Sequence, residues 1–246
     1  MTEKQQVQDQ FLAAHVRDMI RRNAWRSFTG FLDRRQYTML RPMLKEGCFR
    51  FYGGCASAER GILCIHPEDA VPEDSEFPIT CLTITFRETD QITHRDVLGS
   101  LMAQQVTRDC IGDIFVSPGR IQCFVTGAAA AAGMQLTKIG RMGVRVTDAV
   151  PFADDYQQAV KSITGTVASP RLDAILKTAL HLNRETCAEL ICRQLVMVNY
   201  QEITEVSRHL KEGDVFSVRG YGKFCLKSIS MPTKKGRLHI VIEKYL

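Results

Sequence analysis

The amino-acid sequence predicts an α+β protein composed of three small domains. Stretches with the 3.6-residue period of amphipathic helices follow one another along the chain with stretches that alternate every two residues, as strands do. An acidic stretch at residues 66–78 interrupts this pattern with three prolines and five acidic residues. Such a composition is typical of an exposed boundary. We therefore place domains at residues 1–70, 78–150 and 169–246, the first of them an α/β domain.

The N-terminal domain is expected to contain two helices and a pair of strands. Residues 5–27 carry a broad apolar stripe among arginines, which predicts an amphipathic helix. The stripe consists of Phe11, Leu12, His15, Met19 and Ile20. A second helical run covers residues 31–44 and stops at a proline, which lacks the backbone N–H that a helix needs. Residues 49–54 and 61–66 predict two strands, with a tight-turn signal at Gly53–Gly54.

The middle domain has the element order of an α/β plait. A strand, a helix, two hairpin strands, a helix and a strand are predicted at residues 79–86, 93–105, 113–116, 121–125, 128–135 and 144–146. Thr93 can cap the first of these helices, and Asp96 three residues later completes a capping-box pattern. The order resembles the plait of RRM-like RNA-binding domains, so we classify the middle domain as plait-like.

Basic residues in the middle domain are candidate RNA contacts. His94 and Arg95 follow the capping residue at a helix N-terminus, a place that suits a phosphate, although a solvated helix end explains them nearly as well. Lys138, Arg141 and Arg145 lie beside two glycines, and we favour an RNA-facing loop there over a simple turn. A kinase catalytic loop at His-Arg-Asp is excluded because the asparagine that it requires is replaced by leucine.

The C-terminal domain is predicted to consist of two small helices followed by a small sheet. Ser169 can cap the first helix and Pro170 suits its first position, while the second helix begins at Asn183. Short strands follow around residues 196–198 and 215–218. Basic residues fall at the ends of these elements: Arg171, Arg184, Arg193, Arg219 and Lys223. This arrangement is consistent with a module that binds the RNA backbone.

A long spaced pattern in this domain resembles the S-four RNA-binding domain (the αL-type domain named after a small-subunit ribosomal protein). The pattern is R-L-D, then R-x-x-x-A-x-L-I, then V-x-V-N, then G-D-V-x-S-V-R-G. The resemblance implies RNA contacts by the five basic residues above and by Asn199. Three positions depart from it: Gln194 and Tyr200 stand where glycine is usual, and Leu195 where a basic residue is common. Arg193 could replace the missing contact.

A second resemblance covers nearly the whole chain. The runs FYGGCASAER, THRDVLGSLM, GDIFV and LTKIGR, followed by the C-terminal pattern, are similar to the YlmH-type family of bacterial proteins. The resemblance implies binding to rRNA and tRNA on a split large ribosomal subunit that still carries peptidyl-tRNA. It further implies that the protein assists C-terminal tailing of the stalled chain with an RqcH-type partner. An older association of the family is with cell division.

Charge and composition limit the classes of function. The net charge of +5 is distributed as +5 over residues 1–50, −5 over residues 51–170 and +5 over the remainder. The basic ends are candidate polyanion surfaces, although the arginines near the N-terminus could equally serve solubility. No apolar run has membrane-spanning length, and the polar N-terminus does not resemble a signal peptide. The nine cysteines lack disulfide or zinc spacing, so reduced thiols and no metal or cofactor are expected.

We therefore predict a non-enzymatic, cytoplasmic, monomeric RNA-binding protein of the translation apparatus. One alternative is an RNA-modifying enzyme or its accessory, since pseudouridine synthases carry the same S-four module. Such an enzyme needs a catalytic aspartate in a much larger domain, and residues 1–168 show no such motif. Another alternative is an adaptor in cell division with incidental RNA binding.

Overall fold

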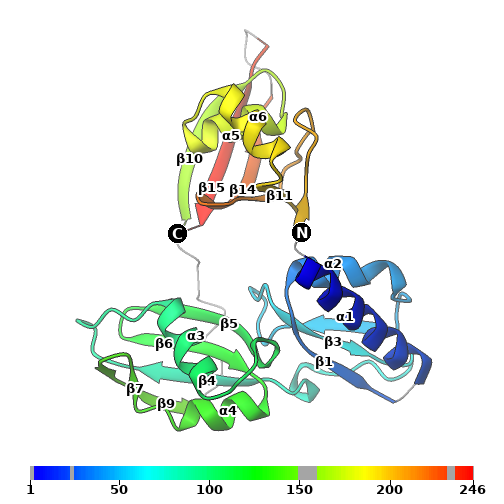
Figure 1. Ribbon diagram of the computed structural model, residues 1–246, viewed down its shortest axis with the longest axis vertical. Coiled ribbons are helices and arrows are strands. Elements are labelled where there is room, and N and C mark those ends of the chain that lie inside the picture. Colours follow the sequence, from blue (N-terminus) through cyan, green and yellow to red (C-terminus); the bar gives the residue numbers. More distant parts are fainter. Residues whose placement is uncertain (1–2, 23–24, 149–159, 232–235, 246) are drawn as a thin grey trace. The chain divides into compact units, whose positions relative to one another are not determined.

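The computed structural model describes residues 3–22, 25–148, 160–231 and 236–245. The chain divides into two compact units, Met1–Tyr156 and Gln157–Leu246. The first unit contains both the N-terminal elements and the plait that the sequence predicts as separate domains (Figure 1). Among the helices of the described part, none combines the length and apolar character needed to cross a membrane.

The N-terminal part of the first unit is a three-stranded antiparallel sheet with two helices. Its elements are α1 (Glu3–Arg22), β1 (Ser27–Leu32), α2 (Arg34–Leu40), η1 (Arg41–Met43), β2 (Phe49–Tyr52) and β3 (Gly61–Ile65). The strand order is β1-β3-β2. Along β1 and β3 successive residues enter different cores, because side chains of a strand alternate between the faces of a sheet. Leu32 and Leu63 pack with the helices, whereas Phe31 and Ile62 pack with aromatic residues on the other face.

Three expectations for this part were wrong in part. The helical run predicted from residue 31 begins with a strand, because Phe31 and Leu32 pair with β3. The helix starts only after Asp33, and the side chains of Asp33 and Gln36 form a capping box there. The predicted stripe of α1 is confirmed only in part. Met19 is buried and Leu12 packs against the same core, together with Ala13 and Val16, whereas Phe11 is 72% exposed. The helix predicted over 5–27 ends at residue 22, and residues 23 and 24 lie outside the described part.

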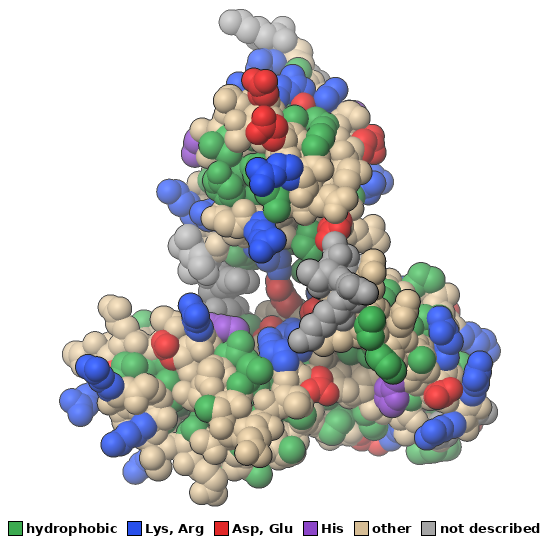
Figure 2. All heavy atoms as spheres, viewed as in Figure 1, with side chains coloured by type: hydrophobic (Ala, Val, Ile, Leu, Met, Phe, Trp, Pro, Cys, Tyr) green, Lys and Arg blue, Asp and Glu red, His purple; other side chains and the backbone are tan. Residues whose placement is uncertain are grey.

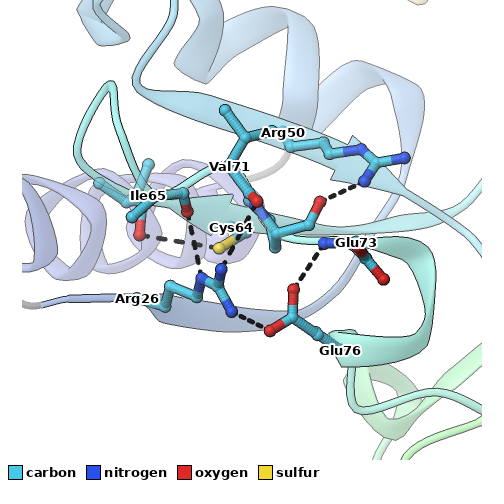
Figure 3. A network of polar contacts seen from close by, with 9 residues as sticks. Arg26, Arg50, Cys64, Ile65, Val71, Glu73 and Glu76 are labelled. Carbon is cyan, nitrogen blue, oxygen red and sulfur yellow. Dashed lines mark hydrogen bonds and ion pairs between the residues drawn. The ribbon is translucent and has the colours of Figure 1, made fainter.

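The acidic stretch at 66–78 keeps its charged side chains in solvent but is anchored to the N-terminal sheet. Arg26 donates hydrogen bonds to the carbonyl oxygens of Ala70 (3.1 Å) and Val71 (3.5 Å) and pairs with Glu76, which also accepts from the backbone N–H of Glu73 at 2.6 Å (Figure 3). Arg50 bonds to the same stretch, at the carbonyl oxygen of Pro72 and the carboxylate of Asp74. The stretch is therefore held against the sheet by two arginines.

The second part of the first unit is a four-stranded antiparallel sheet with two helices on one face. The acidic stretch before it contains η2 (Asp74–Glu76). The elements of this second part are β4 (Thr80–Thr85), α3 (His94–Ala103), η3 (Arg108–Cys110), β5 (Ile111–Ser117), β6 (Arg120–Val125), α4 (Gly127–Met134), β7 (Lys138–Ile139), β8 (Met142–Gly143) and β9 (Arg145–Asp148). The strand order β5-β6-β4-β9, with one helix after β4 and one after β6, is that of a plait. The predicted capping box of Thr93 and Asp96 is confirmed.

The face of the plait sheet opposite the helices is occupied by protein. Cys81, Phe115 and Phe124 lie on this face and pack in one apolar cluster with Phe31 and Phe77 of the N-terminal part. The side chains of all five are at least nine-tenths buried. In RRM-type domains this sheet face carries the aromatic residues that stack on bases. Here its aromatic residues join two parts of one unit instead.

The second unit is a six-stranded antiparallel sheet covered by two helices. Its elements are β10 (Val160–Val167), α5 (Leu172–Leu180), α6 (Arg184–Cys192), β11 (Val196–Val198), β12 (Gln201–Glu202), β13 (Val215–Val218), β14 (Gly222–Ile229) and β15 (Leu238–Tyr245), and the strand order is β10-β15-β14-β13-β11-β12. The predicted start of α6 after Asn183 is confirmed, since the Asn183 side chain accepts a hydrogen bond from the N–H of Thr186. The first helix starts later than predicted, with Arg171 rather than Ser169 at its N-cap.

Two of the positions that depart from the S-four pattern adopt a left-handed backbone. Gln194 has φ +57° and Tyr200 has φ +65°. This region of backbone space favours glycine, which has no Cβ atom to clash. Asn199 also has a positive φ of +48°, so residues 199 and 200 form the two-residue turn between β11 and β12 in which both central residues are left-handed. The protein therefore keeps the backbone that glycine would provide while using larger side chains.

Candidate nucleic-acid interface

The starts of α5 and α6 meet at a buried carboxylate. Each carboxylate oxygen of Asp173 accepts two hydrogen bonds. Oδ1 accepts from Nε of Arg171 at 3.1 Å and from the N–H of Ala174 at 2.9 Å. Oδ2 accepts from Nη2 of Arg171 at 3.2 Å and from Nε of Arg184 at 2.7 Å. The Asp173 side chain is 4% exposed, whereas that of Arg184 is 56% exposed. We call Arg171, Asp173 and Arg184 the arginine clamp.

The clamp follows from where each residue lies in its helix. Arg171 is the N-cap of α5 and also forms an isolated β-bridge with His209, so its backbone is fixed from both sides. Arg184 is the first helical residue of α6, directly after the capping Asn183. Two guanidinium groups are thereby placed at two neighbouring helix N-termini, where backbone N–H groups and the helix dipole already favour anions.

The clamp stabilises the charged form of its carboxylate. Burial acts to raise the pKa of Asp173, but the hydrogen bonds and charges of Arg184 and Arg171 outweigh it and hold this pKa below its usual range. The hydrogen bond and charge of Asp173 in turn raise the pKa of Arg184. Among the residues that the structure describes, Arg184 donates only through Nε. Its two Nη groups are therefore able to bind a further anion such as phosphate, with the planar geometry that arginine offers.

Two other predicted contacts lie at the opposite end of α6. Arg193 is the C-cap of this helix and is exposed. Arg219 is exposed in the turn between β13 and β14, and its backbone N–H bonds to the carbonyl oxygen of Leu195 at 2.9 Å. The structure thus brings the turn carrying Arg219 next to the segment that follows Arg193, and these two residues form a second basic group separate from the clamp.

The remaining predicted residues of this unit are engaged within the fold. Lys223 donates to Tyr200 Oη at 3.2 Å and lies over the rings of Tyr200 and Tyr245. The amide of Asn199 donates to Asp214 Oδ1 at 2.9 Å and accepts from the N–H of Val215 at 3.0 Å. Along β14 the neighbour of Lys223, Phe224, enters the helix-side core. Lys223 therefore lies on the sheet face opposite α5 and α6, and the structure does not bring it together with the clamp.

In the first unit, His94 and Arg95 lie at the exposed start of α3, as predicted. Burial and the charge of Arg108 lower the pKa of His94, while Asp113 opposes this shift. At neutral pH the imidazole is therefore uncharged and adds no positive charge at this helix end. Arg95 is left as the cation of the pair.

A charged junction next to His94 was missed by the sequence analysis. Asp113 of β5 accepts hydrogen bonds from the backbone N–H groups of Glu59 (2.6 Å) and Arg60 (2.9 Å). The Arg60 side chain donates to the carbonyl oxygens of Phe31 and Ile111, both at 3.0 Å. Burial raises the pKa of Asp113, and burial together with the charge of Arg60 lowers the pKa of Arg108 to about 10. These hydrogen bonds connect the loop before β3 to the plait. No local sequence pattern indicates the contact, because Asp113 lies more than 50 residues from Glu59 and Arg60 in the chain.

Lys138 and Arg141 lie on the small β7–β8 hairpin. Lys138 is opposite Gly143 in the register, and Gly140 in the turn has φ +59°. Both basic side chains are exposed. The predicted loop is thus a short hairpin that projects from the plait beside β9.

No group of three His, Cys, Asp or Glu side chains is placed to hold a metal ion among the described residues. All nine cysteines are free thiols, and four of them are buried. Burial raises the pKa of Cys64 to about 11 and those of Cys81 and Cys123 to about 12, so these three thiols stay protonated at neutral pH.

Comparison with known proteins adds three findings. Residues 72–154 match the family described as "Putative RNA-binding domain in YlmH". The chain is 30% identical over 222 residues to "Ribosome-associated protein quality control protein P2" of Bacillus subtilis (strain 168), with 88% of this chain and 86% of that protein covered. The solved structure "Cell division protein ylmH from Streptococcus pneumoniae" matches with a TM-score of 0.52 and 22% identity, over 64% of this chain and 98% of that chain. The last comparison shows a likeness of fold.

The matched region and the basic helix ends define an α+β protein with an RNA-binding domain. The chain belongs to the YlmH family, since its identity to the Bacillus subtilis relative extends over most of both proteins. The family resemblance seen in the sequence is thereby confirmed.

Proposed function

We propose that this protein binds rRNA and tRNA on the large ribosomal subunit and acts in ribosome-associated quality control. In this proposal it recognises a subunit that carries stalled peptidyl-tRNA and assists C-terminal tailing together with an RqcH-type factor. The name of the Bacillus subtilis relative, a ribosome-associated quality control protein, supports this role. The match of residues 72–154 to an RNA-binding family supports RNA as the ligand.

The observation that carries the proposal is the arginine clamp. A carboxylate that is 4% exposed holds two arginines whose outer groups remain accessible at two helix N-termini. A buried carboxylate of this kind fixes the direction of both guanidinium groups before any ligand binds. Because less side-chain entropy is lost on binding, such preorganised groups bind phosphate more tightly than mobile ones. The clamp therefore suits a structured RNA backbone of fixed shape, as in ribosomal RNA.

In this proposal the protein is a cytoplasmic, non-enzymatic and monomeric factor that needs no cofactor. Binding affinity comes from phosphate contacts, and selectivity for one ribosomal state comes from the distances between contacts. We expect no hydrolysis of ATP or GTP and no modified nucleoside in RNA after incubation with the purified chain. Mass spectrometry of digested RNA checks the second point.

Replacing Arg184 with glutamine should weaken binding to isolated large subunits about fivefold, since one charge-assisted contact contributes about 1 kcal/mol or more. Asp173 stays paired with Arg171 in this variant, so the fold is retained. The slope of log affinity against log salt should also become shallower by about one, as expected when one phosphate contact is lost. Co-sedimentation over a series of salt concentrations measures both quantities.

The matched control is Lys161→Gln, which removes one positive charge from exposed β10 of the same unit. Bulk electrostatics predicts the same loss for both variants, whereas the clamp predicts a loss for Arg184→Gln alone. Equal affinities of the two folded variants, or an unchanged salt slope for Arg184→Gln, would refute the assignment of RNA contact to the clamp.

A further inference from the structure

An open cleft of about 500 Å³ lies beside the β7–β8 hairpin of the plait. One wall is the chain that leaves β4, with Thr85, Phe86 and Arg87, and the other carries Thr137, Gly143 and Arg145. Figure 2 shows lysine and arginine side chains gathered over the end of this unit where β7 is labelled in Figure 1. We call this the hairpin cleft.

The backbone around the hairpin cleft is held by regular pairing. Thr85 is opposite Arg145 in the β4–β9 register, and Thr85 Oγ1 donates to the carbonyl oxygen of Arg145 at 3.4 Å. The N–H of Val144 donates to the carbonyl oxygen of Thr137 at 2.9 Å, which closes the base of the hairpin. The two walls are therefore connected through the sheet.

Basic side chains around the cleft are exposed and form no ion pair among the described residues. Arg87 and Arg145 line it, and Lys138 and Arg141 are on the adjoining hairpin. All four side chains are exposed, and none forms an ion pair with a carboxylate of the described residues. Glu88, the nearest acidic residue in sequence to Arg87, lies against Gly119, where an added Cβ would be 2.9 Å from Glu88 Cγ. A polyanion would meet four unpaired cations here.

Gly143 lines the cleft. A Cβ atom added at this glycine would meet no heavy atom within 4 Å, so the fold does not require glycine there for lack of space. Gly143 is opposite Lys138 in the hairpin register, so a larger side chain at 143 would occupy space at the lining of the cleft. The position can be filled without disturbing any packed core.

We propose that the hairpin cleft binds the sugar-phosphate backbone of a single-stranded RNA segment. The inference rests on the proposed function and names a second RNA site, in the first unit. Arginine and lysine would bind the phosphates, the threonine hydroxyls the ribose, and the half-buried ring of Phe86 would form an apolar wall for a ribose or base. The cleft is shallow and open, so a flexible unpaired segment can follow its basic side chains along one side, whereas the rigid backbone of a duplex cannot adapt to them.

The first test fills the cleft without changing charge. In the full chain, Gly143→Leu should weaken binding of a fluorescein-labelled oligouridylate about fivefold, measured by fluorescence anisotropy. The control is Gly99→Leu on exposed α3, where an added Cβ also meets nothing within 4 Å. Equal oligouridylate affinity of the two folded variants would overturn the proposal. RNA binding to a diffuse charged surface would not depend on an uncharged side chain at position 143.

The second test removes charge at matched positions. Arg87→Gln with Arg145→Gln should reduce oligouridylate affinity about tenfold, whereas Arg17→Gln with Arg22→Gln on α1 should change it less than twofold. All four arginines are exposed in the first unit, and each pair lowers the net charge by two. Equal losses of oligouridylate affinity in the two double variants would overturn the proposal. Displacement of the RNA by polyglutamate would also overturn it, and so would equally tight binding of an RNA duplex.

The outcomes separate this site from the proposed function. Loss of oligouridylate binding in the cleft variants, with ribosome binding still sensitive to Arg184→Gln, supports both. Unchanged oligouridylate binding in the cleft variants overturns the cleft alone, because the clamp is tested on large subunits. Ultraviolet crosslinking of the oligouridylate, followed by mass spectrometry, should identify Phe86 as a crosslinked residue.

Discussion

Neutralising the whole arginine clamp should lower affinity for large ribosomal subunits roughly 30-fold or more, because two charge-assisted contacts of about 1 kcal/mol each are lost together. The variant is Arg171→Gln, Asp173→Asn and Arg184→Gln in one chain. Asp173 must be changed with the arginines, since a buried carboxylate left without cationic partners costs about 3–5 kcal/mol and would unfold the unit. Co-sedimentation with large subunits measures the loss, and circular dichroism checks the fold.

A single substitution within the clamp separates positioning from charge. Asp173→Asn raises the net charge by one and leaves both arginines in place, so bulk electrostatics predicts tighter RNA binding. The clamp predicts weaker binding, since an amide lacks the charge that aligns the two guanidinium groups. Tighter binding by the folded Asp173→Asn chain would show that these arginines act only through their charge.

Replacing Gly54 with alanine should destabilise the first unit by about 2–5 kcal/mol, because left-handed backbone strain of about 1–2 kcal/mol adds to overpacking of about 1–3 kcal/mol. Gly54 has φ +97°, and an added Cβ would be 2.3 Å from Phe124 Cδ1. Phe124 is completely buried in the cluster that joins the N-terminal part to the plait, so neither group can move away. Urea unfolding followed by circular dichroism measures the change.

Gly47→Ala is the matched control, because Gly47 also has a positive φ (+78°) but its added Cβ would meet only Glu68 Cγ at 3.8 Å. We expect a cost of about 1 kcal/mol from backbone strain alone. If both variants lose the same stability, the contact between Gly54 and Phe124 does not contribute to the junction.

Local signals in the sequence predicted a large part of this structure. Thr93 and Asn183 cap their helices as their spacing indicates, because a cap depends only on residues within one turn. The order of elements in the plait was predicted for the same reason. Residues 27–32 were misassigned in part because a short apolar run fits a helix and a strand equally well, and only pairing with β3 decides between them.

The candidate site was predicted only in part. The sequence placed Arg171 and Arg184 at helix starts, but the burial of Asp173 between them depends on how α5 and α6 pack. Lys223 carried the same sequence signal, and the alternation of β14 puts it on the other face of the sheet. The junction of Arg60 with Asp113 and the hairpin cleft join segments that are far apart in the sequence, so no local pattern could indicate them.

The burial of both faces of the plait sheet restricts where this domain can vary. Leu82 and Cys123 pack under the helices, while Phe115 and Phe124 pack against the N-terminal aromatics. Substitutions on either face would therefore cost folding stability, since a core filled from both sides tolerates few changes in volume. The exposed hairpins and strand ends are free of this restriction. We therefore expect proteins with this domain to differ in ligand preference mainly at the exposed hairpins and strand ends. Enzymes vary in the same way when their loops diverge while the core stays constant.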